Sequence, residues 1–183
     1  MGKIKVHEFT TLDGVVDAPM WTMDYEFTDE LGDAIGSMMA GCTAILLGRT
    51  TFEGFASSWP QRSAEEDPGA PFFNDTPKYV VSSTLEQPGW GPTTLLGGYD
   101  AGRIARLKQE VDGDLYVSGS RRLVAAMLQD GLVDELHLFV YPVFVQEGVR
   151  LFEAGAPRLP LTLLSSRGLG NGVVHLAYGP AAG

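Results

Sequence analysis

The chain carries the stretch Thr43-Ala44-Ile45-Leu46-Leu47-Gly48-Arg49-Thr50-Thr51-Phe52-Glu53. Its first five residues form an apolar run without alternation, which is typical of a strand buried on both faces. Gly48 ends this run, and residues 50–56 predict a short helix directly after it. A strand that passes straight into a helix is the repeating unit of an α/β fold, and the stretch therefore predicts that fold class.

The same order of strand and helix continues on both sides of this stretch. Residues 3–9 alternate polar and apolar side chains, which predicts a strand with one wetter face. Thr28 is expected to cap a helix over residues 28–40, and Gly41 stands where a C-terminal glycine belongs. Further strands are predicted at residues 78–81, 93–96, 114–118, 135–145, 161–166 and 173–178, and further helices at 100–110 and 119–129.

Two other segments complete the organisation of the chain. Residues 57–76 are polar and contain Pro60, Pro68 and Pro71, so we expect an irregular surface loop there. A turn around Gly170-Asn171-Gly172 is expected to join the last two strands into an antiparallel hairpin. Because alternating strands and helices imply a largely parallel sheet covered on both faces, residues 1–183 predict a single α/β domain with an antiparallel edge.

Composition and charge exclude several classes of function. The chain has 13 Lys and Arg residues against 23 Asp and Glu residues, a formal charge of −10. We expect no nucleic-acid partner, because such proteins present a positive surface. No signal peptide and no run of roughly 18 apolar residues is found, so we expect a cytoplasmic protein without a membrane span. Cys42 is the only cysteine, which rules out an internal disulfide.

Three predicted strands end in residues suited to binding phosphate. One ends in Gly48-Arg49-Thr50-Thr51, a second in Gly119-Ser120-Arg121, and a third in the hydroxyl cluster Ser82-Ser83-Thr84. In open α/β sheets, ligands bind at the carboxyl ends of the strands, where helix N-termini attract anions. Two cationic, glycine-led helix starts and a hydroxyl cluster match a diphosphate with one further phosphate, which points to NADPH. The hydroxyl cluster also suits a plain hydrogen-bonded turn.

Other nucleotide and catalytic motifs are missing from the sequence. It contains neither G-x-G-x-x-G, the ordinary dinucleotide fingerprint, nor the ATP-binding G-x-x-x-x-G-K-[ST]. Gly119-Ser120 lacks the flanking residues of a G-x-S-x-G nucleophile elbow. His7, His137 and His175 stand apart in strand-like segments, which favours structural histidines over a metal site.

With these residues in place, the chain resembles the dihydrofolate reductase-like family, and within it the branch related to the reductase domain of bacterial riboflavin biosynthesis (RibD C-terminal domain-like). The matching pieces keep the family's order along nearly the whole chain. They are Thr11-Leu12-Asp13-Gly14-Val15, Leu47-Gly48-Arg49-Thr50-Thr51-Phe52-Glu53, Lys78-Tyr79-Val80-Val81-Ser82-Ser83, Tyr116-Val117-Ser118-Gly119-Ser120 and Val133-Asp134-Glu135-Leu136-His137-Leu138, followed by Pro142-Val143 and Leu151-Phe152.

This resemblance implies a three-layer αβα dihydrofolate reductase-like fold with a mixed, mainly parallel sheet and an antiparallel C-terminal hairpin. It also implies an NADPH-dependent reductase that forms a homodimer. In such proteins the turns at residues 48–51 and 119–120 hold the cofactor's phosphates, and residues 82–84 receive the adenosine end with its 2′-phosphate. The loop over the nicotinamide corresponds to Leu12, Asp13, Gly14, Val15 and Val16.

The substrate side departs from the family pattern. Dihydrofolate reductases carry an acid on the helix before the Gly-Arg-Thr-Thr turn, and by spacing Asp29 and Asp33 are the nearest candidates for this catalytic acid. Four aromatic residues are candidate walls for a flat substrate: Trp21, Tyr25, Phe55 and Trp59. The expected reaction is hydride transfer from NADPH to a small flat substrate, pterin/folate-like or pyrimidine-like, at a C=N or C=O group. The alternative is a catalytically inactive nucleotide-binding or structural homodimer of the same fold.

The predicted strand at residues 135–145 is apolar on both faces. Leu136, Leu138, Val140 and Phe144 would lie on one face, and His137, Phe139, Tyr141 and Val145 on the other. One face can cover the core of the domain, so the other needs a helix or a second subunit. The resemblance makes a two-fold homodimer the expected cover.

Overall fold

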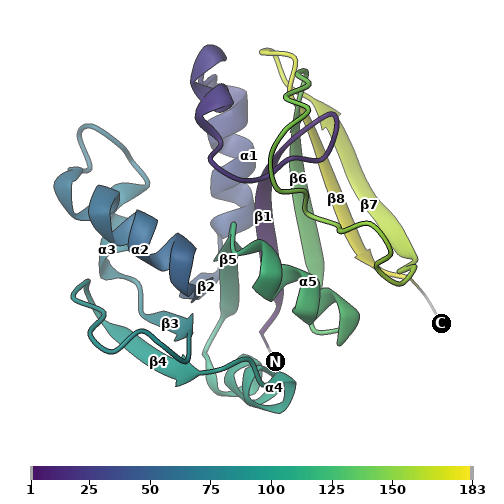
Figure 1. The fold of residues 1–183 in the computed structure, drawn as a ribbon. Helices are drawn as coiled ribbons and strands as arrows, with labels where there is room; N and C mark the ends of the chain where they lie inside the picture. Colours follow the sequence, from purple (N-terminus) through teal and green to yellow (C-terminus); the bar gives the residue numbers. More distant parts are fainter. Residues whose placement is uncertain (1, 182–183) are drawn as a thin grey trace.

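The computed structural model describes residues 2–181 and places its strands in one eight-stranded sheet (Figure 1). Six parallel strands follow the order β4 (Thr93–Gly97), β3 (Lys78–Val81), β2 (Cys42–Gly48), β5 (Asp114–Ser118), β1 (Ile4–Thr11) and β6 (Glu135–Tyr141). β8 (Val174–Pro180) pairs antiparallel with β6, and β7 (Leu161–Gly168) pairs antiparallel with β8. The mixed sheet and its C-terminal hairpin confirm the predicted fold.

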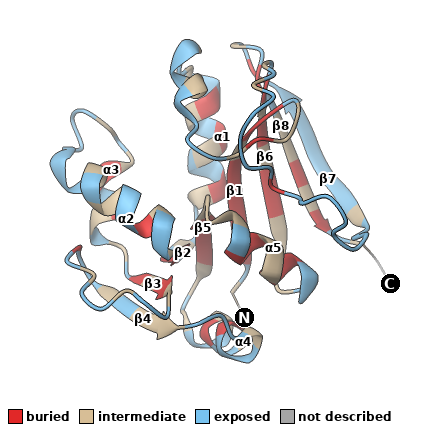
Figure 2. Cartoon of the chain, in the orientation of Figure 1, coloured by how far each residue is buried: buried red, intermediate tan, exposed pale blue. Residues whose placement is uncertain are grey.

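Helices cover both faces of this sheet. One face carries α1 (Asp29–Met39), α2 (Arg49–Ser58) and α3 (Ala70–Asp75), and the opposite face carries α4 (Ala101–Glu110) and α5 (Arg121–Gln129). Phe52 of α2 packs with Ile45 of β2, whereas Val124 of α5 packs with Val6 of β1. The buried residues follow the central strands between the two helical layers (Figure 2). No helix in the described part of the chain is long and apolar enough to cross a membrane.

Local signals place the helix ends where the sequence predicts them. The Thr28 side chain caps α1 by accepting the N–H of Leu31 at 3.3 Å. Asp100 caps α4 by accepting the N–H of Arg103 at 2.7 Å. Gly41 has φ +82°, the left-handed conformation that ends a helix.

Two segments differ from the prediction. Residues 57–76 are not irregular throughout, because the short helix η2 (Trp59–Gln61) and α3 form there, with Ala70 and Phe73 buried. β6 ends at Tyr141 rather than at Val145. Pro142 follows directly, and proline has no N–H to continue the ladder.

The predicted wetter face of β1 is absent. Lys5, His7 and Glu8 are all buried, because β1 lies between β5 and β6 with helical layers on both sides. The ammonium of Lys5 is compensated there: it lies 2.8 Å from the Asp114 carboxylate and donates to the Ala40 carbonyl at 3.1 Å. Central strand position therefore overrides the alternation of polar and apolar residues.

The hairpin end of the sheet is thinly covered. In Figure 1 the hairpin extends beyond α5, and most residues of β7 are exposed, with Leu163 exposed by 52%. Leu138 of β6 and Leu176 of β8, which are partners in the sheet register, are only half-buried. An apolar strip on this face is thus left without a helix.

Candidate active site

The two glycine turns predicted to bind phosphate lie side by side, because β2 and β5 are neighbours in the sheet. The Gly48 N–H donates to Ser120 Oγ at 2.9 Å, and the Ser120 N–H donates to Thr51 Oγ1 at 2.9 Å. Each turn is therefore fixed by a hydroxyl group of the other. The structure brings these predicted residues into one site at the carboxyl edge of the sheet.

The second turn holds an unusual backbone conformation. Gly119 has φ +55° and Ser120 has φ +61°, and the left-handed region costs a residue other than glycine about 1–3 kcal/mol. A Cβ at position 119 would lie 3.3 Å from Thr51 Oγ1, a tight contact that the Thr51 side chain would have to relieve by shifting. Such strain persists where neighbouring groups hold it, here the crossed hydrogen bonds, and it is common at ligand sites.

The helix starts behind both turns are open. α2 begins after Gly48 and α5 begins after Ser120, and neither has a side-chain cap. Free N–H groups and the positive end of the helix dipole attract anions. Two such starts next to each other suit the two phosphates of a diphosphate.

The arginines of the two turns differ in their freedom to reach an anion. The Arg49 side chain is 51% exposed, and its Nη1 lies 3.8 Å from Glu53 Oε1. The Arg121 side chain is largely buried, and its Nη1 lies 2.6 Å from Glu153 Oε1. Arg121 therefore ties α5 to the segment around Glu153, whereas Arg49 is free to turn toward a phosphate.

The hydroxyl cluster after β3 is a hydrogen-bonded turn. Ser82 Oγ accepts the N–H of Thr84 at 3.2 Å and the N–H of Leu85 at 3.0 Å. The side chains of Ser83 and Thr84 remain exposed. Ser82 thus builds the turn, and the next two residues present hydroxyl groups to solvent.

Sequence reasoning missed Arg103 of α4, which adds a positive charge beside this turn. Gly97 at the end of β4 bridges to Ser82, and a Cβ at position 97 would lie 3.2 Å from Arg103 Nη1. The signal available in the sequence was a cation one turn into the helix that follows β4.

The predicted nicotinamide loop is fixed by Asp13. Its carboxylate accepts the Thr11 hydroxyl at 2.6 Å and the Gln146 N–H at 2.9 Å. These bonds, that from Thr11 above all, lower the pKa of Asp13. Val15 is buried and Gly14 turns the chain with φ +83°, so Leu12, 55% exposed, is the side chain left to contact a ligand.

The two candidate acids do not face the sheet. Asp29 and Asp33 are exposed on α1, whose buried residues Leu31 and Ala34 lie on another side of the helix. The structure therefore brings neither carboxylate to the turns.

The four aromatic candidates fall into two groups rather than one wall. Trp21 and Tyr25 pack on Tyr141, with ring centroids 5.1 and 5.3 Å apart. Phe55 and Trp59 pack around Phe73, on which Trp59 stacks at 4.0 Å. The two groups belong to separate core clusters. Trp21 lies in η1 (Met20–Asp24) with Tyr25 directly after it, whereas Phe55 lies in α2 and Trp59 begins η2.

His7 is a buried polar residue next to the turn at Gly119. The His7 carbonyl accepts the Gly119 N–H at 3.2 Å, and its Nδ1 lies 2.9 Å from Tyr116 Oη. Burial, with smaller contributions from His137 and His175, lowers the pKa of His7 to about 3, so the ring is neutral. Its Nε2 has no hydrogen-bond partner in the described part of the chain.

The other two histidines, distant in sequence, meet in the sheet. His137 Nδ1 lies 2.9 Å from His175 Nε2, and His137 Nε2 lies 3.1 Å from Glu135 Oε2. Within residues 2–181, no group of three or more His, Cys, Asp or Glu side chains is arranged to hold a metal ion.

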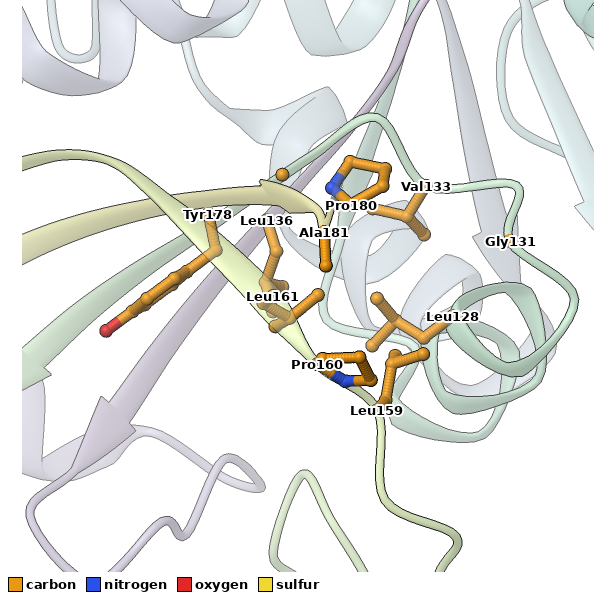
Figure 3. Close-up of a pocket in the computed structure, with 11 residues that line it drawn as sticks. Leu128, Gly131, Val133, Leu136, Leu159, Pro160, Leu161, Tyr178, Pro180 and Ala181 are labelled. Atoms are coloured by element: carbon orange, nitrogen blue, oxygen red, sulfur yellow. The ribbon is translucent and has the colours of Figure 1, made fainter. Parts of the chain in front are cut away.

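An apolar pocket of about 210 Å³ lies away from these turns (Figure 3). Leu128, Leu136, Leu161 and Tyr178 are among its lining residues. Leu136 stands at the beginning of β6, so the pocket opens at the amino end of the parallel strands. Ligands of α/β sheets bind at the opposite edge, and the pocket is therefore separate from the candidate site.

Comparison with known proteins places the chain in a family. The family profile of the RibD C-terminal domain matches residues 3–93 and 101–175. The chain belongs to the RibD C-terminal domain family. This member is 26% identical to protein YyaP of Bacillus subtilis (strain 168) over 174 residues, which cover 92% of this chain and 89% of YyaP.

Solved structures share the fold of this RibD C-terminal domain protein. A putative riboflavin biosynthesis protein from Shewanella sp. PV-4 superposes with a TM-score of 0.79 at 21% identity, covering 100% of both chains. Dihydrofolate reductase from Enterococcus faecalis, solved with NADP(H), superposes with a TM-score of 0.64 at 12% identity, covering 99% of this chain and 98% of that enzyme. The expected dihydrofolate reductase-like fold is confirmed.

Proposed function

We propose that this protein is an NADPH-dependent reductase that transfers a hydride to a C=N or C=O group of a small flat substrate, pterin/folate-like or pyrimidine-like. The interlocked turns carry the proposal, because the bonds between Gly48, Thr51 and Ser120 set two uncapped helix starts side by side. Membership of the RibD C-terminal domain family supports a reductase. A shared fold with a dihydrofolate reductase that holds NADP(H) supports the choice of cofactor.

The residues at the turns fit this cofactor. The uncapped backbone N–H groups that begin α2 at Arg49 and α5 at Arg121 would hold the diphosphate, in turns shaped by Gly48, Gly119 and Ser120. The Arg49 side chain would add a charge-assisted contact. Ser83, Thr84 and Arg103 would surround the 2′-phosphate that distinguishes NADPH from NADH. Leu12 would cover the nicotinamide from the loop that Asp13 fixes.

Hydride transfer depends mainly on positioning, since the reacting carbons must approach to about 3–3.5 Å. NADPH, when bound, supplies the hydride. On the α1 side of the sheet, the free Nε2 of His7 would orient a polar edge of the substrate, with the Tyr116 hydroxyl fixing the ring. Because the pKa of His7 is about 3, the imidazole acts as a neutral hydrogen-bonding group and the proton comes from another source.

The same proposal includes a homodimer that covers the open face of the hairpin. Leu163 is exposed there, and Leu138 and Leu176 are only half-buried, so apolar surface remains on this face. A second copy of the chain would bury this strip under two-fold symmetry.

Titration calorimetry with NADPH and NADH tests the cofactor, and loss of NADPH absorbance with dihydropterin and aminopyrimidinone substrates tests the reaction. We expect NADPH to bind more tightly than NADH and at least one substrate class to be reduced. Tight NADPH binding without turnover of any substrate would favour an inactive nucleotide-binding protein. Equal or undetectable binding of the two cofactors would refute the assignment of the 2′-phosphate.

A further inference from the structure

Glu8 of β1 is a buried acid without a hydrogen-bond partner among the described residues. Its residue surface is only 2% exposed, and its Oε1 accepts no hydrogen bond within the described part of the chain. Burial alone raises the pKa of this carboxyl to about 8, so it is mostly protonated at neutral pH. Native proteins rarely leave a buried polar atom unsatisfied, and each such atom needs an explanation.

No charged side chain among the described residues pairs with Glu8, and burial is the only cause of its raised pKa. Arg121 and Arg122 on α5, and Asp13 and Asp17 on the loop after β1, form no hydrogen bond or ion pair with it. Tyr116 on the neighbouring strand has its own partner, His7 Nδ1. Within residues 2–181, Glu8 therefore belongs to no ion pair or hydrogen-bond network.

The position of Glu8 relates it to the candidate site. The pairing of β1 with β5 ends at His7 and Ser118, just where Gly119 begins the second turn. Glu8 is the next residue on β1, and by strand alternation its side chain points to the same face as Val6, which α5 covers. It lies where β1 and β5 part, next to the open start of α5.

A protonated carboxyl has a specific chemical complement. It offers one O–H donor beside one C=O acceptor, which matches an amide that presents an N–H beside a C=O. The carboxamide of a nicotinamide has this arrangement, and so does the lactam edge of a pterin. Glu8 lies on the α5 side of the sheet, whereas His7, which we propose to contact the substrate, faces the α1 side. The placement of Glu8 therefore favours the carboxamide of the cofactor over the lactam of a pterin.

We propose that Glu8 is a ligand-binding residue whose neutral carboxyl forms a two-point hydrogen-bonded pair with the carboxamide of the bound nicotinamide. The inference rests on the proposed function and deepens it, because it assigns a side chain to the nicotinamide end of the cofactor. Oε1, which has no hydrogen-bond partner in the described part of the free protein, would then accept the N–H of the carboxamide.

Calorimetric binding of NADP⁺ to wild-type protein, Glu8→Gln and Glu8→Leu tests the pair. Gln keeps a donor beside an acceptor and should bind nearly as wild type does, whereas Leu keeps the volume but loses both groups. We expect Glu8→Leu to weaken NADP⁺ binding by about ten- to a hundredfold, the equivalent of two neutral hydrogen bonds. Circular dichroism confirms that each variant is folded.

Two further ligands identify the source of the effect. 2′-Phospho-ADP-ribose lacks the nicotinamide, and its affinity should be the same in all three proteins. A free pterin should also be unaffected; a loss confined to the pterin would overturn the assignment to the cofactor. If wild type binds NADP⁺ and Glu8→Leu binds it equally well, the inference is wrong and the proposed function stands. If wild type binds no NADP⁺, both are wrong.

Discussion

Glu8→Gln should change how the stability of the ligand-free protein depends on pH. The pKa of Glu8 is raised from 4.5 to about 8 in the folded state. Between these values the folded protein keeps the proton and the unfolded chain releases it, so rising pH favours unfolding. One proton corresponds to about 1.4 kcal/mol per pH unit, and Glu8 therefore costs about 2–3 kcal/mol of stability between roughly pH 5.5 and 7.5.

Two histidines act in the opposite direction over the same range. Burial lowers the pKa of His7 to about 3 and of His175 to about 4 from the usual 6.5. Their unfolded forms bind protons below about pH 6.5, so stability rises with pH as those protons leave. These contributions, and that of His137, whose pKa burial also lowers, oppose the effect of Glu8 in the wild-type profile. The contribution of Glu8 is therefore measured from the difference between variant and wild type, where the histidine effects cancel.

Urea unfolding at about pH 5.5 and at about pH 7.5 measures this difference. The free energy of unfolding of Glu8→Gln, relative to wild type, should rise by about 2–3 kcal/mol from the lower to the higher pH, because glutamine does not titrate. Glu86→Gln, at an exposed loop position, is the matched control and should show no such rise. A Glu8→Gln difference that is the same at both pH values would refute the burial of a neutral carboxyl.

Three other substitutions test the site and the assembly. Arg49→Ala should weaken NADPH binding by about one to two decades with little change in melting temperature, since its side chain is half exposed. Arg158→Ala, at another exposed arginine, is the control. Wild-type NADPH affinity in Arg49→Ala would exclude Arg49 as a cofactor ligand. Gly119→Ala should cost about 1–2 kcal/mol of stability and also impair NADPH binding, because its Cβ meets Thr51. Gly131→Ala has a similar positive φ with no atom within 4 Å, so it should lose stability but keep affinity; equal NADPH binding by both alanine variants would contradict the packing argument. Leu163→Asp should convert the proposed dimer to a monomer in light scattering, whereas Thr162→Asp, on the other face of β7, should not. A wild-type protein that is monomeric at micromolar concentration would count against the dimer.

Local patterns were sufficient for the parts of the site made by continuous chain. The apolar run at residues 43–47 and the glycine after it predict β2, the turn and the start of α2 without knowledge of their neighbours. The same holds for β5 and α5. Because both strands are parallel members of one sheet, their carboxyl ends meet at one edge, which makes the pairing of the two turns predictable.

The residues that were missed depend on contacts between distant segments. The alternation in β1 predicts a wet face, but β6 and β5 enclose this strand and bury Glu8 and His7. Arg103 approaches the turn at Ser82 only because Gly97 bridges to that turn. Spacing along the chain points to Asp29 and Asp33 but does not specify the side of α1 on which they lie.

The crossed hydrogen bonds between the turns make the proposed cofactor site a property of the folded sheet alone. The bond from Gly48 to Ser120 spans 72 positions, and that from Ser120 to Thr51 spans 69. A partly folded chain in which β2 and β5 have not paired offers only two separate turns, so a dinucleotide has nothing to bridge. By linkage, a ligand at a hundredfold excess over its Kd would add about 2.7 kcal/mol to the free energy of unfolding. On the proposed function, bound cofactor would thus add to the resistance of this protein to proteolysis. A newly made chain would gain that protection only after residues at both ends of these bonds had left the ribosome.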